Sequence, residues 1–506
     1  MNLVKQIDDI SVKMGNRLVY DYLGDTNTYD DLKKRSDSLA FQIDNLGLSK
    51  TTPIIVYGDQ TFNTIVAFIA CVKSGHAYIP VDEHSSEDRI TMIQDVAHAE
   101  LIIALNDLPV EVPNVKVITS AKLKSIFNHP IDYVMTHPVD GDDNFYIIFT
   151  SGTTGKPKGV QISHDNLQSF LDWMDNSFGL PEHAVGLSQT AYSFDLSGMD
   201  LYPTLTLGGE LQAIPREVTE DFRQLFNTLE NLTTNFWVST PSFVDICLLS
   251  KTFNQEHYPE LNYFFLCGEE LTHSTAERLK KRFPDAHIYN TYGPTEATVA
   301  VTAIDITDEI LEKYDRLPIG YIKSDSQAWI DVDGEQKFGE NGELILCGPT
   351  VSKGYLNAPE KTEKSFFVNN GQRAYRTGDV GMQEQDGLLF FAGRKDFQIK
   401  MHGFRIELEE IAHYLNQLPQ INQGVVVPKY NHDRKVSALI AYVVKQPQLS
   451  ADDDDLHLTS KLKDALQHEL MPYMIPQQFV YRDNLPLNIN GKVDINTLIK
   501  EVNANG

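Results

Sequence analysis

Short apolar runs rich in β-branched residues alternate with helical patterns over the first three quarters of the chain. These runs cover residues 53–57, 65–72, 101–104 and 115–118. Alternation of buried apolar runs with helical patterns is typical of βαβ units and a largely parallel sheet. The pattern therefore predicts an α/β fold.

The pattern changes from about Gly339 onward. Short strand patterns separated by glycine turns follow, as in residues 342–348. Such spacing favours a more antiparallel, barrel-like portion. We expect this portion to belong to the large N-terminal domain.

A glycine and three charged residues at 393–396 separate the strand-like residues 388–391 from a new strand–helix unit. Helical spacing and buried-strand patterns follow, at 407–415, 424–427 and 438–444. They predict a compact C-terminal α/β domain of roughly 110 residues. We expect an N-terminal domain of residues 1–394 and a C-terminal domain of residues 395–506.

Composition and charge exclude several classes of protein. The chain has 506 residues, with 43 Lys and Arg against 70 Asp and Glu and a formal net charge of −27. This charge repels phosphate backbones and anionic membrane surfaces, which argues against nucleic-acid binding. The N-terminus lacks the apolar stretch of a signal peptide, and the run at 65–72 is far shorter than the ~20 residues that span a bilayer. We expect a cytoplasmic protein without membrane insertion.

Four cysteines lie far apart in the sequence, at positions 71, 247, 267 and 347. None belongs to a C-x-x-C pair, so neither a zinc ribbon nor a disulfide framework is indicated. We expect reduced thiols.

A loop rich in glycine, hydroxyl and lysine residues follows the apolar run at 146–149. Its candidate ligand residues are Thr150, Ser151, Gly152, Thr153, Thr154 and Lys158. Glycines let backbone N–H groups turn toward an anion, and the lysines add positive charge, so the loop is typical of a phosphate site. It is not a Walker A loop, because Pro157 stands where that motif needs glycine. The alternative is a polar hairpin without a ligand. Ser163 is the expected N-cap of the following helix.

Two further loops follow strand patterns. The strand-like residues 286–289 lead into Asn290, Thr291, Tyr292, Gly293, Pro294, Thr295 and Glu296. The ring of Tyr292 could stack on a base, and Glu296 is an oxygen ligand suited to Mg²⁺ held between phosphates. The strand pattern at 261–266 leads into Cys267. Loops at strand carboxyl ends converge where open α/β sheets bind ligands, although a simple Gly-Pro turn is the alternative for the first loop.

Two isolated residues complete the candidate site. Asp379, predicted in a turn, could accept both hydroxyls of a ribose, or could merely cap that turn. Lys492 lies on a predicted turn, where most lysines are simply solvated.

Taken together, these motifs resemble those of the acyl-adenylate-forming superfamily. They are residues 151–159, 292–296, 375–379, 393–396 with 403–407, and 490–492, in family order and spacing over nearly the whole chain. The resemblance implies an enzyme that joins an acid to AMP at the expense of ATP. It further implies a mobile C-terminal domain that rotates about a hinge at Asp396.

The resemblance also assigns roles to individual residues. Lys492 is the implied catalytic residue, and Glu296 the implied Mg²⁺ ligand. The implied ATP-binding residues are Thr150, Ser151, Gly152, Thr153, Thr154, Lys158, Asn290, Thr291, Tyr292, Gly293, Pro294, Thr295, Asp379, Phe391, Ala392, Gly393, Arg394 and Lys492.

Residues 73–82 and 194–197 resemble the amino-acid-activating branch of the superfamily. In that branch Asp195 would bind the substrate ammonium through a charge-assisted hydrogen bond, rather than being a structural turn residue. The closest likeness is to enzymes that activate D-alanine and load it on the phosphopantetheine thiol of a carrier protein, for teichoic-acid alanylation. Cys267 and Val299 would then bound a methyl-sized pocket, and Lys492 would contact the substrate carboxylate.

Three alternatives stay open at this point. The chain could be a free-standing adenylation domain for another small amino acid, an acyl-CoA synthetase, or a non-catalytic nucleotide-binding scaffold. The choice of D- over L-alanine depends on whole-chain likeness alone. Since carriers of this kind are usually acidic and this chain is acidic too, we expect carrier docking on a local basic or apolar patch.

Overall fold

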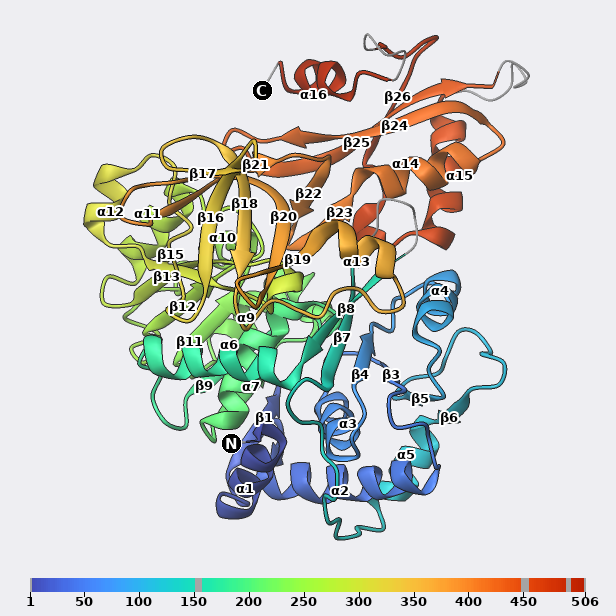
Figure 1. Cartoon of the computed structure of the whole chain (residues 1–506), viewed down its shortest axis with the longest axis vertical. Coiled ribbons are helices and arrows are strands. Elements are labelled where there is room, and N and C mark those ends of the chain that lie inside the picture. The colour runs from blue at the N-terminus through green and yellow to red at the C-terminus, as the bar shows by residue number, and fades with distance from the viewer. Residues whose placement is uncertain (1, 151–156, 447–454, 488–492, 505–506) are drawn as a thin grey trace. The chain divides into compact units, whose positions relative to one another are not determined.

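The computed structural model describes residues 2–150, 157–446, 455–487 and 493–504 (Figure 1). The chain divides into two compact units. The larger unit comprises residues 1–83, 96–149 and 159–395, and the smaller comprises 84–95, 150–158 and 396–506. The expected domain boundary between residues 394 and 395 stays a prediction.

A six-stranded sheet in the order β6-β5-β3-β4-β7-β8 forms from the first apolar runs. Its strands are β3 (Ile54–Tyr57), β4 (Tyr78–Val81), β5 (Leu101–Ala104), β6 (Lys116–Ile118), β7 (Asn144–Thr150) and β8 (Lys158–Ser163). Every residue of β3, β4 and β5 is buried, and these strands pair in parallel, as expected for a sheet covered on both faces. The helices that begin the chain and connect these strands are α1 (Leu3–Lys13), α2 (Tyr29–Asn45), α3 (Phe62–Lys73) and α5 (Ser120–Phe127). The apolar run at 65–72 lies in α3.

A nine-stranded sheet in the order β15-β14-β13-β12-β11-β9-β10-β1-β2 follows. Its strands are β1 (Leu18–Tyr22), β2 (Asp25–Thr28), β9 (Val185–Ser188), β10 (Glu210–Ala213), β11 (Phe236–Ser239), β12 (Tyr263–Leu266), β13 (His287–Tyr292), β14 (Thr302–Asp305) and β15 (Tyr321–Ile322). The six central strands pair in parallel, in the order β13, β12, β11, β9, β10 and β1. Strand β2 at one edge, and β14 and β15 at the other, pair in antiparallel fashion. The helices of this region are α6 (His164–Ser177), α7 (Gly198–Thr206), α8 (Arg216–Thr219), α9 (Phe222–Leu229), α10 (Pro241–Cys247), α11 (His273–Arg282) and α12 (Asp308–Lys313), with short 3₁₀ turns η1 (Asp195–Ser197) and η2 (Thr295–Ala297). The predicted α/β fold is confirmed.

The predicted antiparallel portion is present in the larger unit, yellow to orange in Figure 1. Its strands are β16 (Gln327–Val332), β17 (Glu335–Lys337), β18 (Gly342–Cys347), β19 (Phe366–Asn369), β20 (Gln372–Gln383) and β21 (Leu389–Arg394), with α13 (Pro359–Ser365) before β19. The turn predicted around Asp379 is wrong: residues 375–379 lie inside β20. The register with β18 shifts there, and Gly378 has a φ of +71°, so a β-bulge replaces the turn.

The smaller unit has two sheets and its own hydrophobic core. Its elements are β22 (Gln398–Met401), β23 (Phe404–Glu407), α14 (Leu408–Gln417), β24 (Ile421–Tyr430), β25 (Val436–Lys445), α15 (Asp455–Glu469), η3 (Pro472–Met474), β26 (Gln478–Tyr481) and α16 (Ile495–Asn503), together with most of α4 (Glu87–Ala97). The helix predicted at 407–415 and the strands predicted at 424–427 and 438–444 are confirmed as α14, β24 and β25. Within the described part of the chain, no helix combines the length and apolar character needed to cross a membrane.

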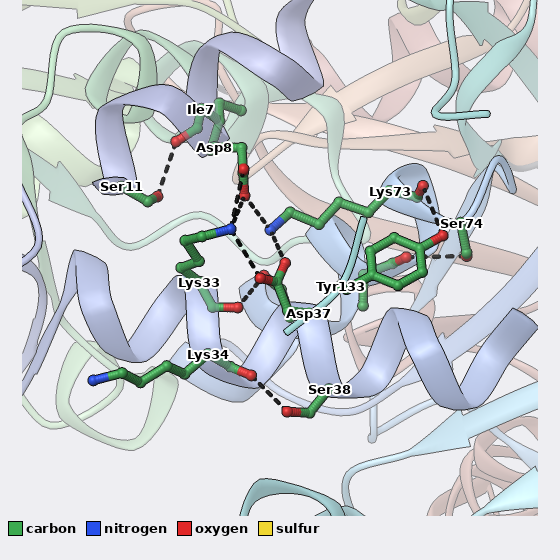
Figure 2. A network of polar contacts seen from close by, with 12 residues as sticks. Ile7, Asp8, Ser11, Lys33, Lys34, Asp37, Ser38, Lys73, Ser74 and Tyr133 are labelled. Atoms are coloured by element: carbon green, nitrogen blue, oxygen red, sulfur yellow. Dashed lines mark hydrogen bonds and ion pairs between the residues drawn. The ribbon is translucent and has the colours of Figure 1, made fainter. Parts of the chain in front are cut away.

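A buried ion-pair network joins α1, α2 and α3 (Figure 2). Lys73 ends α3, and its Nζ lies 2.6 Å from Asp8 Oδ1 and 2.6 Å from Asp37 Oδ1. Lys33 Nζ lies 3.0 Å from Asp8 and 2.8 Å from Asp37. Burial raises the pKa of the Asp8 carboxyl, but the charges and hydrogen bonds of Lys73 and Lys33 together outweigh it, and the pKa lies below its ordinary value.

Replacing Lys73 by methionine should destabilise the fold by about 1.5–3 kcal/mol, because the buried Asp37 and the partly buried Asp8 then lose the more deeply buried of the two lysines that pair with both of them. The pKa of Asp8 is lowered in the folded state, so its contribution to stability is full above the unfolded pKa and is lost as the pH falls through the folded pKa. Urea unfolding at neutral pH and at several acidic pH values measures both the loss of stability in the variant and its dependence on pH. Lys34→Met is the control, since its pair with Asp30 is exposed, and it should leave the unfolding midpoint unchanged.

Candidate active site

The two ends of the predicted phosphate loop are described, and its core is not. β7 ends at Thr150 and β8 begins at Lys158, while Ser151, Gly152, Thr153 and Thr154 lie outside the described residues. The Thr150 hydroxyl is buried and has no hydrogen-bond partner among the described residues. A buried hydroxyl left in this state is costly, so it is suited to donate to a ligand.

The strand that leaves the loop continues into α6, as predicted. The Ser163 hydroxyl accepts from the Asn166 backbone N–H at 3.2 Å, and the Asn166 side chain accepts from the Ser163 N–H at 3.0 Å. This reciprocal capping box fixes the start of the helix.

The other two predicted loops follow neighbouring strands, although the predicted start of one of them is wrong. Asn290, Thr291 and Tyr292 are the last residues of β13, because they pair with β14, and the loop begins at Gly293. β12 and β13 are parallel, with Leu266 opposite Asn290. The Thr291 hydroxyl donates to the Leu266 carbonyl at 3.1 Å, and the Cys267 N–H donates to the Ser239 carbonyl at 3.2 Å. The ends of β11, β12 and β13 therefore present Cys267 and residues 290–296 at one edge of the sheet, where α/β folds bind ligands.

Three residues from separate motifs meet at one carboxylate. The Tyr292 hydroxyl donates to Asp379 Oδ2, and Arg394 Nη1 donates to Asp379 Oδ1 at 2.5 Å. Burial and then the Asp379 charge raise the pKa of Tyr292 well above its ordinary value, so this phenol is a donor at neutral pH. A carboxylate can still accept further hydrogen bonds at its remaining lone pairs, as binding a diol requires.

The bulge in β20 sets the position of this carboxylate. The Thr377 hydroxyl donates to the Leu344 carbonyl at 2.7 Å and accepts from the Asp379 N–H at 2.9 Å. The Gly378 N–H donates to the Glu343 carboxylate at 3.1 Å. Asp379 thus lies on a rigid strand irregularity opposite Arg394 of β21, rather than on an isolated turn.

Several predicted nucleotide residues use their side chains for the fold. The Asn290 amide donates to the Pro318 carbonyl at 2.7 Å, and the Thr291 hydroxyl donates to the Leu266 carbonyl. A side chain at Gly293 would collide with the backbone, since a Cβ there would lie 2.6 Å from Ala300 Cα. On β21, the Phe391 ring lies 6.4 Å from the Tyr292 ring, and Ala392 and Gly393 lead on to Arg394.

Glu296 is a fully buried carboxylate on η2. Tyr355, which belongs to none of the motifs in the sequence, donates its hydroxyl to Glu296 Oε1 at 2.8 Å. Among the residues that the structure describes, no three His, Cys, Asp or Glu side chains gather as a metal site. A single buried carboxylate fits Mg²⁺ held mainly by substrate phosphates and water, rather than in a cage of protein ligands.

Asp195, Cys267 and Val299, which are predicted to hold an amino acid, all lie in the larger unit. Asp195 begins η1 and is buried, and its charge helps to raise the pKa of Tyr146 after the larger effect of burial. Val299 lies close to Gly198, the residue that follows η1 and begins α7. A Cβ built on Gly198 would lie 3.4 Å from Val299 Cγ2. Val299 and Cys267 are both buried in the large hydrophobic core of this unit. Val299 has a φ of +65°, a strained conformation for a β-branched residue that is frequent at ligand sites.

The two remaining predicted site residues, Asp396 and Lys492, belong to the segment of residues 396–506, which is part of the smaller unit. Asp396 is the first residue of this segment, and its carboxylate accepts from the Gln398 N–H at 3.3 Å. Lys492 lies outside the described residues. All four cysteines lie within the described residues, where they are buried and form no disulfide.

Comparison with known proteins places this geometry in context. Residues 9–356 match the family model "AMP-binding enzyme", and residues 410–492 match "AMP-binding enzyme C-terminal domain". The chain is 56% identical to a D-alanine–D-alanyl carrier protein ligase of Lactiplantibacillus plantarum, over 99% of each chain. It is 51% identical to a protein of the same name from Streptococcus agalactiae serotype III, again over 99% of each. Among solved structures, the Vibrio cholerae adenylation domain AlmE, bound to glycyl-adenosine-5′-phosphate, is similar in fold: TM-score 0.82, 24% identity, and 100% and 98% of the two chains covered.

Proposed function

The chain belongs to the AMP-binding enzyme family, and from this premise we propose that it activates D-alanine with ATP and transfers the D-alanyl group to a carrier protein. It is an adenylate-forming ligase. The acceptor is the phosphopantetheine thiol of a D-alanyl carrier protein, and the alanine is destined for teichoic or lipoteichoic acid of a Gram-positive cell wall. We place the reaction in the cytoplasm, where ATP is available.

The observation that carries the nucleotide part of this proposal is the meeting of Tyr292, Asp379 and Arg394. These residues belong to three motifs far apart in the sequence, and the resemblance assigned all three to ATP. The choice of D-alanine is supported by the identity of 50–56% to full-length relatives that carry this name.

The first half-reaction needs no general base. The carboxyl group of alanine, with a pKa of ~3.3–3.7, is ionised at neutral pH. One carboxylate oxygen attacks the α-phosphorus of ATP, the bond to the β-phosphate breaks, and pyrophosphate leaves. Catalysis then consists of positioning and of stabilising negative charge.

We assign each part of ATP to residues of this chain. Residues 150–154 and Lys158 hold the β- and γ-phosphates, and residues 290–295 surround adenine and the α-phosphate. Asp379 and Arg394 hold the ribose, beside residues 391–393. Glu296 would bind Mg²⁺, which would neutralise part of the charge of the leaving pyrophosphate.

The amino acid lies at the other end of the proposed site. The Asp195 carboxylate binds its ammonium, and Cys267 and Val299 bound the space for its methyl group. Lys492 contacts the substrate carboxylate and the α-phosphate, where two negative groups must approach.

The second half-reaction moves the alanyl group from oxygen to sulfur. The carrier thiol loses its proton to solvent, its sulfur attacks the alanyl carbonyl carbon, the bond to the phosphate oxygen breaks, and AMP leaves. We propose that residues 395–506 rotate about Asp396 between the two half-reactions. The rotation would remove Lys492 from the site and open a channel through which the phosphopantetheine arm reaches the alanyl group.

Exchange of labelled pyrophosphate into ATP tests the substrate assignment. We expect D-alanine to support the fastest exchange in a panel with L-alanine, glycine, serine and short fatty acids. A preference for an acid without an amine would overturn the role of Asp195 and favour an acyl-CoA synthetase. Exchange with no acid would favour a non-catalytic scaffold.

Asp379→Asn should raise the KM for ATP about ten- to a hundred-fold, with little change in the KM for D-alanine. The change keeps the shape of the side chain but removes a charge-assisted hydrogen bond, which is worth about 1.5–3 kcal/mol. Steady-state exchange kinetics measure both constants. Asp331→Asn is the control: it loses an ion pair with Arg376 at 3.2 Å in the same sheet, and it should behave as wild type. An unchanged KM for ATP in Asp379→Asn would contradict the ribose assignment.

A further inference from the structure

In the larger unit, the segment of residues 350–356 connects strand β8 with the turn that carries Glu296. At its far end, Tyr355 pairs with Val160 of β8 in an antiparallel bridge. The Leu356 N–H donates to the Gly159 carbonyl at 2.8 Å, and the Gln161 N–H donates to the Gly354 carbonyl at 3.1 Å. The backbone around Tyr355 is therefore held against β8 on both sides of the tyrosine.

The near end of the same segment is fastened to the turn that carries Glu296. The Ser352 N–H donates to the Glu296 carbonyl at 2.9 Å. The Thr298 hydroxyl donates to the Thr350 carbonyl at 2.7 Å, and Thr298 has a φ of +59°. Residues 350–356 thus fix the backbone of Glu296 while reaching across to β8.

The Tyr355 side chain completes this connection. Its ring is buried and packs edge-on against Phe366, with centroids 5.4 Å apart at 79°. Its hydroxyl donates to Glu296 Oε1 at 2.8 Å, inside the protein. A phenol is a neutral donor, so it fixes the direction of the carboxylate without cancelling the negative charge that a cation needs.

We propose that Tyr355 is a positioning residue for the divalent cation that accompanies ATP, an inference that rests on the proposed function. By holding Oε1, Tyr355 sets the orientation of the Glu296 carboxylate and thereby the direction in which Oε2 is presented. Hydrogen-bonding partners of metal ligands typically change metal affinity about 10- to 100-fold when they are removed. Tyr355 therefore affects cation binding through Glu296, without touching the substrates.

The test is a titration of the full-length chain with Mn²⁺, followed by electron paramagnetic resonance, in the presence of an ATP analogue with a methylene group between the α- and β-phosphates. Mn²⁺ replaces Mg²⁺ as the probe, and no catalysis is needed. We expect Tyr355→Phe to weaken Mn²⁺ binding about tenfold or more, while binding of D-alanine, measured separately by calorimetry, is unchanged. Glu296→Gln should weaken Mn²⁺ binding at least as much.

Two further variants separate orientation of the carboxylate from general packing. Tyr321→Phe removes a hydroxyl that contacts the Asp386 carboxylate at 3.2 Å on an exposed strand, and it should bind Mn²⁺ as wild type does. Thr298→Val loosens the turn of Glu296 but keeps its phenol partner, so it should weaken Mn²⁺ binding less than Tyr355→Phe does. Thermal unfolding checks that each variant is folded.

Unchanged Mn²⁺ affinity in Tyr355→Phe would overturn the proposal, as would an equal loss in Thr298→Val. A Tyr355→Phe chain that does not fold would also overturn it, because the hydroxyl would then be a structural requirement. These outcomes leave the proposed function intact. Failure of the proposed function would instead appear as a wild-type chain that supports no pyrophosphate exchange with any acid.

Discussion

Replacing Lys492 by alanine is expected to slow adenylation of D-alanine by about a hundred- to a thousand-fold, the usual effect of removing one group that stabilises transition-state charge. The reason is electrostatic. The attacking carboxylate and the α-phosphate are both negative, and a lysine ammonium between them lowers the energy of their approach. Transfer from D-alanyl-AMP to the carrier joins a thiolate to a carbonyl carbon and does not bring these two anions together, so it should be nearly unaffected.

Single-turnover kinetics with each half-reaction started separately measure this difference. D-alanyl-AMP is added directly for the transfer step, and ATP with D-alanine for the adenylation step. Lys500→Ala is the control, because this exposed lysine lies on α16 close in sequence, and both steps should proceed at wild-type rates. Equal losses in both half-reactions for Lys492→Ala would contradict the assigned role.

Replacing Asp195 by alanine should produce the other large effect, a loss in kcat/KM for D-alanine worth about 2–5 kcal/mol, or ~30- to several-thousand-fold. Asp195 is buried, so its pairing with the substrate ammonium is poorly screened by water. Removing it leaves the ammonium without a counter-ion in the site. The KM for ATP should change little.

The discrimination between D-alanine and propionate tests this role most sharply. The wild-type chain should prefer D-alanine strongly, and Asp195→Ala should lose most of that preference because propionate has no ammonium to bind. Asp175→Ala, at a half-buried aspartate of α6, should keep the preference. A variant at position 195 that kept full discrimination would show that another group binds the amine.

Periodicity was sufficient to predict the strands and helices of this fold where one pattern dominated. The buried runs of β3 and β5 and the amphipathic helix α14 follow from local residue spacing. The bulge at Asp379 could not be predicted in this way, because Gly378 and its neighbours fit a turn as well as a bulge. Only the pairing of β20 with β18 shows that these residues form a bulge.

The spacing of residues along the sequence cannot predict the long-range contacts of the candidate site. Tyr292, Asp379 and Arg394 were each identified from their own motif, but their hydrogen bonds depend on how two sheets fold in the larger unit. Tyr355 gave no signal, since a lone tyrosine between Gly354 and Leu356 has no distinctive pattern. In the same way, the motif that contains Lys73 gave no hint of its pairing with Asp8 and Asp37 of two other helices.

The most direct measurement is the intact mass of a phosphopantetheine-bearing D-alanyl carrier protein after incubation with this chain, ATP and Mg²⁺. With D-alanine, we expect the carrier mass to rise by one alanyl group, and we expect the increase to be reversed by hydroxylamine, which cleaves thioesters. A carrier without the phosphopantetheine arm should gain nothing, and L-alanine should load far more slowly. No mass gain with D-alanine, or equal loading by both enantiomers, would contradict the account.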